Sequence, residues 1–177
     1  MAVLHKLLNY IIQIPLNNHA TQCFGENTMI LTPNDYKLIS SLTINDEIIN
    51  GKNEKVKITN IIQSPINQEI YCIPKDSISI NVPNNDLYIT GNHAIKINNK
   101  FHHIKCLFNQ KKYNISNTNN NMIIYNISTN NWQKDTINAN NIECETLCND
   151  VLIKWLCRLD QCYPKIYNKK IIKYLKK

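Results

Sequence analysis

The residues best suited to chemistry in this chain are one cysteine, Cys23, and a Thr-x-x-His pair further along, Thr90 and His93. A cysteine side chain is the most nucleophilic one near neutral pH once its proton is removed. A hydroxyl and an imidazole held beside it could orient an amide and transfer a proton. Each of the three also has a structural alternative, as a buried thiol, a turn threonine or a hydrogen-bonded core histidine. They can act together only if the fold brings them together.

Both groups lie in stretches that have the character of β-strands. Side chains alternate in type over residues 28–32, which predicts a strand directly after Cys23. Residues 87–97 have the same character, and Gly91-Asn92 interrupts them with a turn signal. A strand that ends in such a turn could hold a hydroxyl and an imidazole near one point.

Three blocks of sequence follow one another: Cys-Phe-x-x-x-Thr-x-Ile from Cys23, Ile-x-x-Leu-x-x-x-Asp-x-Ile from Ile39, and Leu-x-x-Thr-x-x-His from Leu87. In this order and spacing they resemble the Hint superfamily, which comprises the hedgehog autoprocessing domains, the inteins and related intein-like domains. Cys-Phe at the start is closer to hedgehog domains than to many inteins. The resemblance divides the chain into an extein-like flanking segment (1–22), a Hint domain (23–147) and a basic helical tail (148–177).

The resemblance implies that the chain cleaves itself at the Gln22–Cys23 bond. In the family the first cysteine attacks the carbonyl before it and turns the amide into a thioester. On this sequence Thr90 would orient the scissile amide, and His93 would protonate the departing amine of Cys23. Twisting an amide and protonating its nitrogen both remove the resonance that stabilises it, and general acid–base help contributes about 10²–10⁴-fold. Water, a thiol or another nucleophile would then resolve the thioester in a single-turnover, autocatalytic reaction.

The end of the Hint-like region departs from the intein pattern. Residues 122–128 and 135–147 resemble the penultimate and closing strands of the family. Inteins commonly end in His-Asn, and the terminal Asn cyclises to free the second junction. Glu145 and Thr146 stand at these two positions. We therefore expect cleavage at Cys23 without splicing.

Two further residues are candidates for the site. Cys144 would lie on the closing strand, which in the family runs beside the site, so it could accept the acyl group or tune the reaction, or be a buried structural cysteine. Asp135 stands near the place where inteins often carry a helper histidine. It could be a base or a turn residue.

Regularly spaced short strands predict an all-β fold class. The resemblance implies the compact Hint fold of short strands with pseudo-two-fold symmetry, here with helical extensions at both ends. Residues 109–121 are predicted to be a polar loop, too short for the homing endonuclease that inteins often carry at such a place. The predicted strands before that loop are 28–32, 47–49, 56–63, 69–73, 77–82, 86–90, 94–97 and 101–106.

Asparagine is abundant and glycine is rare, with 3 residues in the whole chain. We expect Asn to replace Gly in loops that need a positive φ, because Asn tolerates the left-handed region better than most residues do. Asn45 is one case, since the family often has Gly-Asp where this chain has Asn45-Asp46. Asn50-Gly51 predicts a β-hairpin.

The net charge of +7 is concentrated at the C-terminus, since residues 165–177 contain six Lys and no acid. The remainder is near neutral, which argues against a broad or specific nucleic-acid surface on the body. Apolar residues at helical spacing predict helices in the tail, which could dock on the body or bind an acidic surface or anionic lipid. Residues 1–22 contain a second helical pattern that stops at Pro15. This segment could pack on the body, and it could also be the part of the chain that is released on cleavage, the substrate of the reaction.

Seven cysteines, an odd number, and no convincing secretory signal favour reduced thiols in a cytoplasm-like compartment. No run reaches the roughly 18 apolar residues of a membrane span. His102-His103-x-x-Cys106 and the later cysteines lack the paired short spacers of zinc sites, so no metal and no cofactor is expected. Because His102 and His103 lie on a predicted strand, they should point to opposite faces, so at most one could face the site.

Two other functions remain open on the sequence. A Hint-like β module that has lost activity would serve as a binding or structural domain. A basic-tail adaptor for nucleic acid or membrane is the third possibility. Loss of an N-terminal tag from the intact chain distinguishes the first function from the second.

Overall fold

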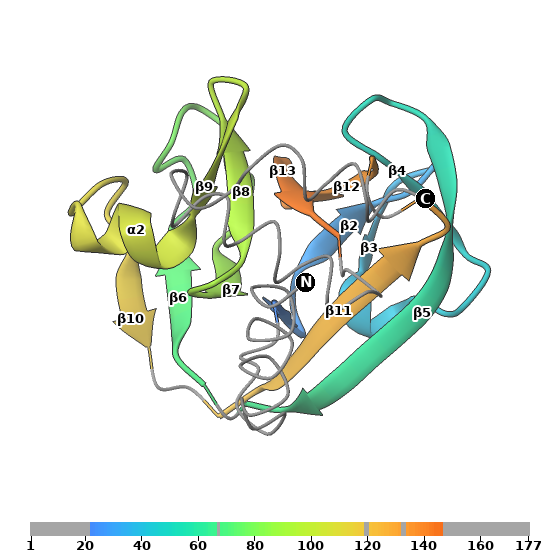
Figure 1. Cartoon of the computed structure of the whole chain (residues 1–177), viewed down its shortest axis with the longest axis horizontal. Coiled ribbons are helices and arrows are strands. Elements are labelled where there is room, and N and C mark those ends of the chain that lie inside the picture. The colour runs from blue at the N-terminus through green and yellow to red at the C-terminus, as the bar shows by residue number, and fades with distance from the viewer. Residues whose placement is uncertain (1–21, 67, 119–120, 132–133, 147–177) are drawn as a thin grey trace, which may run out of the picture.

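The structure, a computed structural model, describes residues 22–66, 68–118, 121–131 and 134–146. β-strands are the main element of this part, and the helical elements in it are the 3-10 turn η2 (Ile39–Ser41) and the short helix α2 (Ile104–Asn109) (Figure 1). The all-β prediction is therefore confirmed. The strands are β1 (Phe24–Gly25), β2 (Met29–Leu31), β3 (Tyr36–Leu38), β4 (Glu47–Ile49), β5 (Lys55–Pro65), β6 (Ile70–Ile73), β7 (Leu87–Thr90), β8 (Ala94–Ile97), β9 (Lys100–His103), β10 (Ser116–Thr118), β11 (Ile123–Thr129), β12 (Thr136–Ala139) and β13 (Ile142–Glu145).

The strands form two antiparallel sheets. One has seven strands in the order β10-β6-β7-β1-β11-β5-β4, and the other has six in the order β3-β2-β12-β13-β8-β9. Figure 1 shows β5 and β11 as a long curved ribbon on one side of the molecule, with β6 to β10 and α2 grouped on the other. Strands β1, β2, β12 and β13 lie between them.

Isoleucine supplies much of the core. Ile30, Ile58, Ile89, Ile95 and Ile127 are all completely buried in one cluster. Full burial of such a side chain contributes about 1.5–3 kcal/mol. Because β-branched residues also suit the pleated backbone of a strand, the Ile-rich composition favours both the sheet and its core.

The two-residue strand β1 is the element that places the candidate nucleophile. Phe24 pairs with Ile89 of β7 on one side and with Tyr125 of β11 on the other. In antiparallel pairing, the residue before Phe24 lies opposite the residue after each partner. Cys23 is therefore set between Thr90 and Asn126, which are far from it in the sequence.

Most of the predicted strands are confirmed. Glu47–Ile49 and Ala94–Ile97 are strands with the predicted bounds, and the predicted strands 28–32, 56–63, 69–73 and 86–90 correspond to β2, β5, β6 and β7. The Asn50-Gly51 hairpin is confirmed as well. It joins β4 to β5 and is closed by a hydrogen bond from Asn50 N to Glu54 O of 3.0 Å.

Other predictions were wrong in detail. Residues 77–82 form turns with an isolated bridge between Ser79 and Val82, because the chain reverses within that segment. The predicted strand 101–106 ends at His103, where α2 begins. The predicted loop 109–121 contains β10, a polar edge strand whose register is supplied by β6. The closing segment 135–147 contains two strands, β12 and β13, joined by a turn.

Asparagine takes the role of glycine in the turns, as predicted. Of the eleven non-glycine residues with positive φ in the described part of the chain, eight are Asn. They include Asn45 with φ 78° and the β12–β13 turn at Asn140 and Asn141 with φ 47° and 64°. None of the three glycines has a positive φ. Asn side chains hydrogen-bond locally and tolerate the left-handed region, which explains the substitution.

Several predictions fall outside the described residues. They concern the helix proposed within residues 1–21, the Lys-rich tail from 148 onward and the cysteines it contains. In the part of the chain that is described, no helix is long and apolar enough to cross a membrane.

Candidate active site

Cys23 and Thr90 are joined by two hydrogen bonds. The backbone N–H of Cys23 donates to Thr90 Oγ1 at 2.9 Å, and the backbone N–H of Thr90 donates to Cys23 O at 3.0 Å. Both residues are almost completely buried. The N–H held by Thr90 belongs to the Gln22–Cys23 peptide, so Thr90 contacts the amide that the sequence predicted it would orient.

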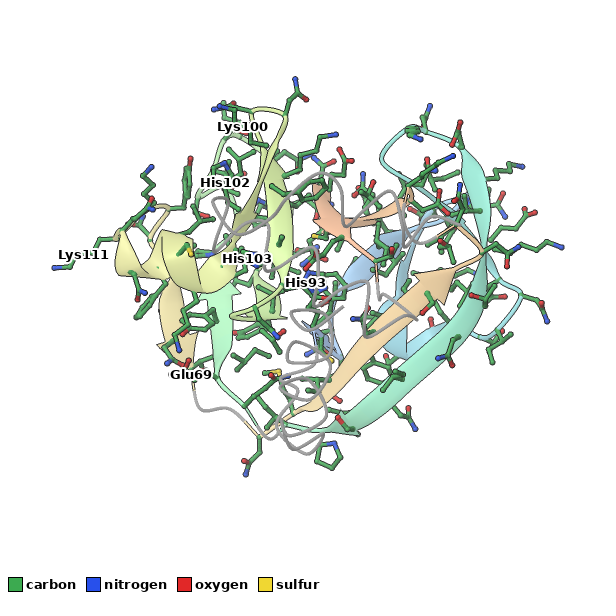
Figure 2. All side chains as sticks on the ribbon, viewed as in Figure 1. Glu69, His93, Lys100, His102, His103 and Lys111 are labelled. Atoms are coloured by element: carbon green, nitrogen blue, oxygen red, sulfur yellow. The ribbon has the colours of Figure 1, made fainter. Side chains whose placement is uncertain are left out.

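His93 lies beside the same segment. Its ring packs against the ring of Phe24 with 4.4 Å between centroids and 50° between planes. The side chain is completely buried, and Nδ1 is 3.5 Å from Ala94 O. Figure 2 shows His93 toward the middle of the molecule, whereas Lys100 and His102 lie further out. The fold thus brings Cys23, Thr90 and His93 into one buried region.

A tight turn carries His93 to this position. The N–H of His93 donates to Thr90 O at 3.0 Å and closes the turn, and the N–H of Lys105 donates to Gly91 O at 2.8 Å. Gly91 packs directly on an aromatic ring, since a Cβ at this position would lie 2.6 Å from Tyr71 Cε2. Glycine is therefore required here by close packing rather than by its φ.

Asn126 contacts the other end of the candidate scissile bond. Its side-chain Nδ2 donates to the backbone carbonyl oxygen of Gln22. The Asn126 amide is completely buried, and its Oδ1 accepts the N–H of Ile127 at 2.8 Å, which fixes its orientation. A fixed N–H donor aimed at this oxygen can stabilise the negative charge that develops when the carbonyl is attacked.

The side chain of Gln22 is also held. Its Nε2 donates to Glu145 Oε1 of β13 and lies 3.3 Å from Asn92 O. The same Glu145 oxygen accepts the N–H of Ala94 at 3.0 Å. The residue before Cys23 is thus fixed through both its backbone carbonyl and its side-chain amide.

Sequence reasoning did not assign roles to Asn126, Asn92 or Glu145. One signal for Asn126 was present, because it is a polar amide in the apolar run Ile-Ile-Tyr-Asn-Ile of β11. A buried polar group of this kind needs a partner, but only strand pairing identifies that partner. For Glu145 the sequence shows only that it stands where inteins commonly have His, and it gives no sign of the contact with Gln22.

Solved structures of inteins share this arrangement of strands. A DnaB intein from Synechocystis sp. PCC 6803 is 14% identical with a TM-score of 0.54, and the match covers 72% of this chain and 100% of that one. The chain has the Hint fold. The gp41-1 intein matches with 14% identity and a TM-score of 0.50, over 72% of this chain and 100% of that one.

A bacterial intein-like domain from Clostridium thermocellum also matches, with 13% identity, a TM-score of 0.52 and coverage of 70% of this chain and 97% of that one. No family model matches the sequence, and neither does any curated protein. At such low identity the comparisons establish the Hint fold of this chain and nothing finer.

Cys144 lies in the hydrophobic core, on β13 opposite Ile95 of β8. It is completely buried, and its Sγ is 3.5 Å from Ile142 O. Burial, followed by the nearby Glu145 and Glu143, raises the pKa of the Cys144 thiol well above its ordinary value. Because a protonated thiol is a poor nucleophile, these features favour the structural role over the role of acyl acceptor.

Asp135 ties together the segments at the start of β12. Its carboxylate accepts hydrogen bonds from Thr129 Oγ1 at 2.6 Å and from Asn50 Nδ2 at 3.2 Å. Its backbone oxygen accepts the Thr146 hydroxyl at 3.3 Å. These contacts favour the turn role for Asp135 over that of a base.

His102 and His103 end strand β9 and are both half-buried. His103 Nδ1 lies 3.0 Å from Asn92 O, so this histidine contacts the turn that carries His93, and Figure 2 shows it nearer to His93 than His102 is. Within the described residues, no three His, Cys, Asp or Glu side chains gather as a metal site.

Proposed function

We propose that this chain is a self-cleaving Hint domain that breaks the Gln22–Cys23 peptide bond by an N-to-S acyl shift. The observation that carries the proposal is the pair of contacts on that peptide: Thr90 accepts its N–H and Asn126 donates to its carbonyl oxygen. Both contacting side chains are completely buried. Polar contacts of this kind act strongly where water is excluded.

In the first step the Cys23 thiol transfers its proton to the His93 imidazole, and its sulfur attacks the carbonyl carbon of Gln22. A C–S bond forms, and the carbonyl electron pair moves to the oxygen, where Asn126 Nδ2 stabilises the charge. One such donor is worth about 10²–10³-fold in rate. Because Gln22 and Cys23 are adjacent residues, the covalent chain itself keeps the Cys23 sulfur close to the Gln22 carbonyl carbon.

In the second step the C–N bond breaks and the pair of electrons goes to the amide nitrogen of Cys23. His93, which lies beside Phe24, passes the proton taken from the thiol to that nitrogen. Thr90 Oγ1 accepts the N–H of Cys23 and so orients this amide. The product is a thioester between Gln22 and Cys23 with a free amine on Cys23.

Water or a thiol then takes the acyl group and releases the segment that ends in Gln22. Splicing is not proposed, because Glu145 and Thr146 occupy the positions of the His and Asn with which inteins commonly end. Without a terminal Asn there is no cyclisation to open a second junction. The proposed extent of the Hint domain is 23–147.

The test is the mass of the intact chain carrying a tag before Met1, with and without dithiothreitol. The wild-type chain should lose the tag after Gln22, faster with the thiol, and Cys23→Ala should keep it. A wild-type chain that keeps its tag under thiol would contradict the proposal. It would favour the inactive β module, which the burial of Cys23, only 1% exposed, also supports.

A further inference from the structure

The side-chain amide of Gln22 contacts two hydrogen-bond acceptors, Glu145 Oε1 and Asn92 O. Gln22 is 2% exposed. Its Nε2 donates to Glu145 Oε1 and approaches Asn92 O at 3.3 Å, whereas its buried Oε1 has no hydrogen-bond partner among the described residues. The pocket, defined here as Glu145 Oε1 and Asn92 O, therefore contacts the nitrogen of the amide and leaves the oxygen without a donor.

Both acceptors of this pocket are fixed by neighbouring groups. Glu145 Oε1 also accepts the N–H of Ala94 at 3.0 Å, and Asn92 O lies 3.0 Å from His103 Nδ1. These contacts attach the pocket to strands β8 and β9 and to the turn that carries His93. Neither oxygen can be replaced by a hydrogen-bond donor in this position unless these contacts break.

We infer that this acceptor pocket selects the residue before the cleavage point, and that Glu145 is its specificity-determining residue. The side chain it favours ends in an N–H donor at the length of glutamine. The inference rests on the proposed cleavage at Cys23. It goes further because it names the substrate feature that is recognised, the side chain of the residue before the cleaved bond. By fixing the side chain of Gln22, the pocket also positions the Gln22 carbonyl against Asn126.

The chemistry of the pocket gives an order among substitutions of Gln22. Gln22→Met has a similar length but no donor, so it loses the hydrogen bond to Glu145 Oε1 and sets an apolar group against that oxygen. Sites built to bond a polar group discriminate strongly against analogues that lack it. Gln22→Glu is worse, because it faces a second carboxylate. Gln22→Lys brings a donor and should be accepted better than either.

The experiment measures tag loss from the full chain under dithiothreitol. We expect Gln22→Met to slow cleavage at least tenfold and Gln22→Glu about 100-fold. Adding Glu145→Gln to the Gln22→Glu chain should recover at least tenfold, because glutamine at 145 can donate to the new carboxylate. Glu143→Gln is the matched control. It makes the same change on the same strand, but Glu143 is paired with Lys96 at 2.8 Å and should not rescue.

A second measurement separates this inference from the proposed cleavage. In a Cys23→Ala background, which cannot form a thioester, Gln22→Glu should lower Tm by about 3–6 °C, and Glu145→Gln should restore most of that loss. If the wild-type chain cleaves but Glu145→Gln rescues neither rate nor Tm, the pocket is not the specificity site. If the wild-type chain never cleaves but Glu145→Gln restores Tm, the proposed cleavage is refuted, whereas the contact between Gln22 and Glu145 is supported.

Discussion

Thr90 and Asn126 hold opposite ends of one peptide unit, the bond between Gln22 and Cys23. Thr90 Oγ1 accepts its N–H at 2.9 Å, and Asn126 Nδ2 donates to its carbonyl oxygen. The two residues come from β7 and β11, the strands on either side of β1. A peptide gripped at both ends by buried side chains is a bond whose conformation the fold controls.

Replacing Asn126 tests the proposed stabilisation of the carbonyl oxygen. Asn126→Ala removes the donor, so thiol-dependent cleavage should slow by about 10²–10³-fold. The variant should still fold, at a cost of about 1–3 kcal/mol for the buried N–H of Ile127 that loses its partner. Rates come from mass spectra over time, and the fold from circular dichroism. A folded Asn126→Ala chain that cleaves within threefold of wild type would refute the assignment.

Replacing Thr90 tests the contact at the N–H end of the Gln22–Cys23 peptide. Thr90→Val keeps the shape of the side chain but removes the acceptor for the Cys23 N–H. The unfolding free energy should fall by about 1–3 kcal/mol, because a buried donor is left unpaired, and cleavage should slow at least tenfold. Thr90→Ser keeps an oxygen at the same place and should therefore retain most of the unfolding free energy and most of the cleavage rate. Equal rates for the Val and Ser variants would show that the hydroxyl has no part in the reaction.

The sequence was enough to place Cys23, Thr90 and His93 together, because the order and spacing of their blocks resemble a known fold. It was not enough for Asn126 or Glu145. Their contacts with Gln22 depend on which strands pair and in which register, since a shift of one residue would turn each side chain to the other face. Neither has a neighbour in sequence that would show its partner.

The same reason separates the predicted strands from the missed ones. Strands with Ile-rich alternation, such as Ala94–Ile97, are recognised from their own residues. Ser116–Thr118 is polar, and only its pairing with Ile70–Ile73 makes it a strand. Residues 104–106 contain nothing that excludes a strand, yet they begin α2, which packs Ile104 and Leu107 into the core.

Positive φ at Asn45 gives a prediction about stability alone. With φ 78°, this position suits glycine, which has no Cβ to strain. Asn45→Ala should destabilise the protein by about 1–2 kcal/mol. Asn45→Gly should change the unfolding free energy by about 0.5 kcal/mol or less, because glycine adopts this φ without strain. Urea unfolding of the two variants measures the difference. Equal losses for Ala and Gly would mean that a side-chain contact of Asn45, rather than its backbone, is what matters.

Cys144 gives a prediction about pH. Burial raises the pKa of this thiol well above its ordinary value near 9.0, while the unfolded chain keeps that ordinary value. Above about pH 9 the unfolded state therefore loses its proton before the folded state does, so the stability contributed by the neutral buried thiol is present below pH 9 and falls as pH rises further. Cys144→Ala removes this dependence and should flatten the stability profile between pH 9 and 10.5.

Alkylation of the intact protein by iodoacetamide provides the matching chemical measurement. The exposed Cys106 should react at pH 8, whereas Cys144 should stay unmodified until the chain unfolds. Cys144→Ala should also leave cleavage at Cys23 within threefold of wild type, because a protonated thiol in the core is a poor acceptor for the acyl group. If Cys144→Ala abolished release of the N-terminal segment while the thioester still formed, Cys144 would be the acceptor, and its burial would have to be relieved during the reaction.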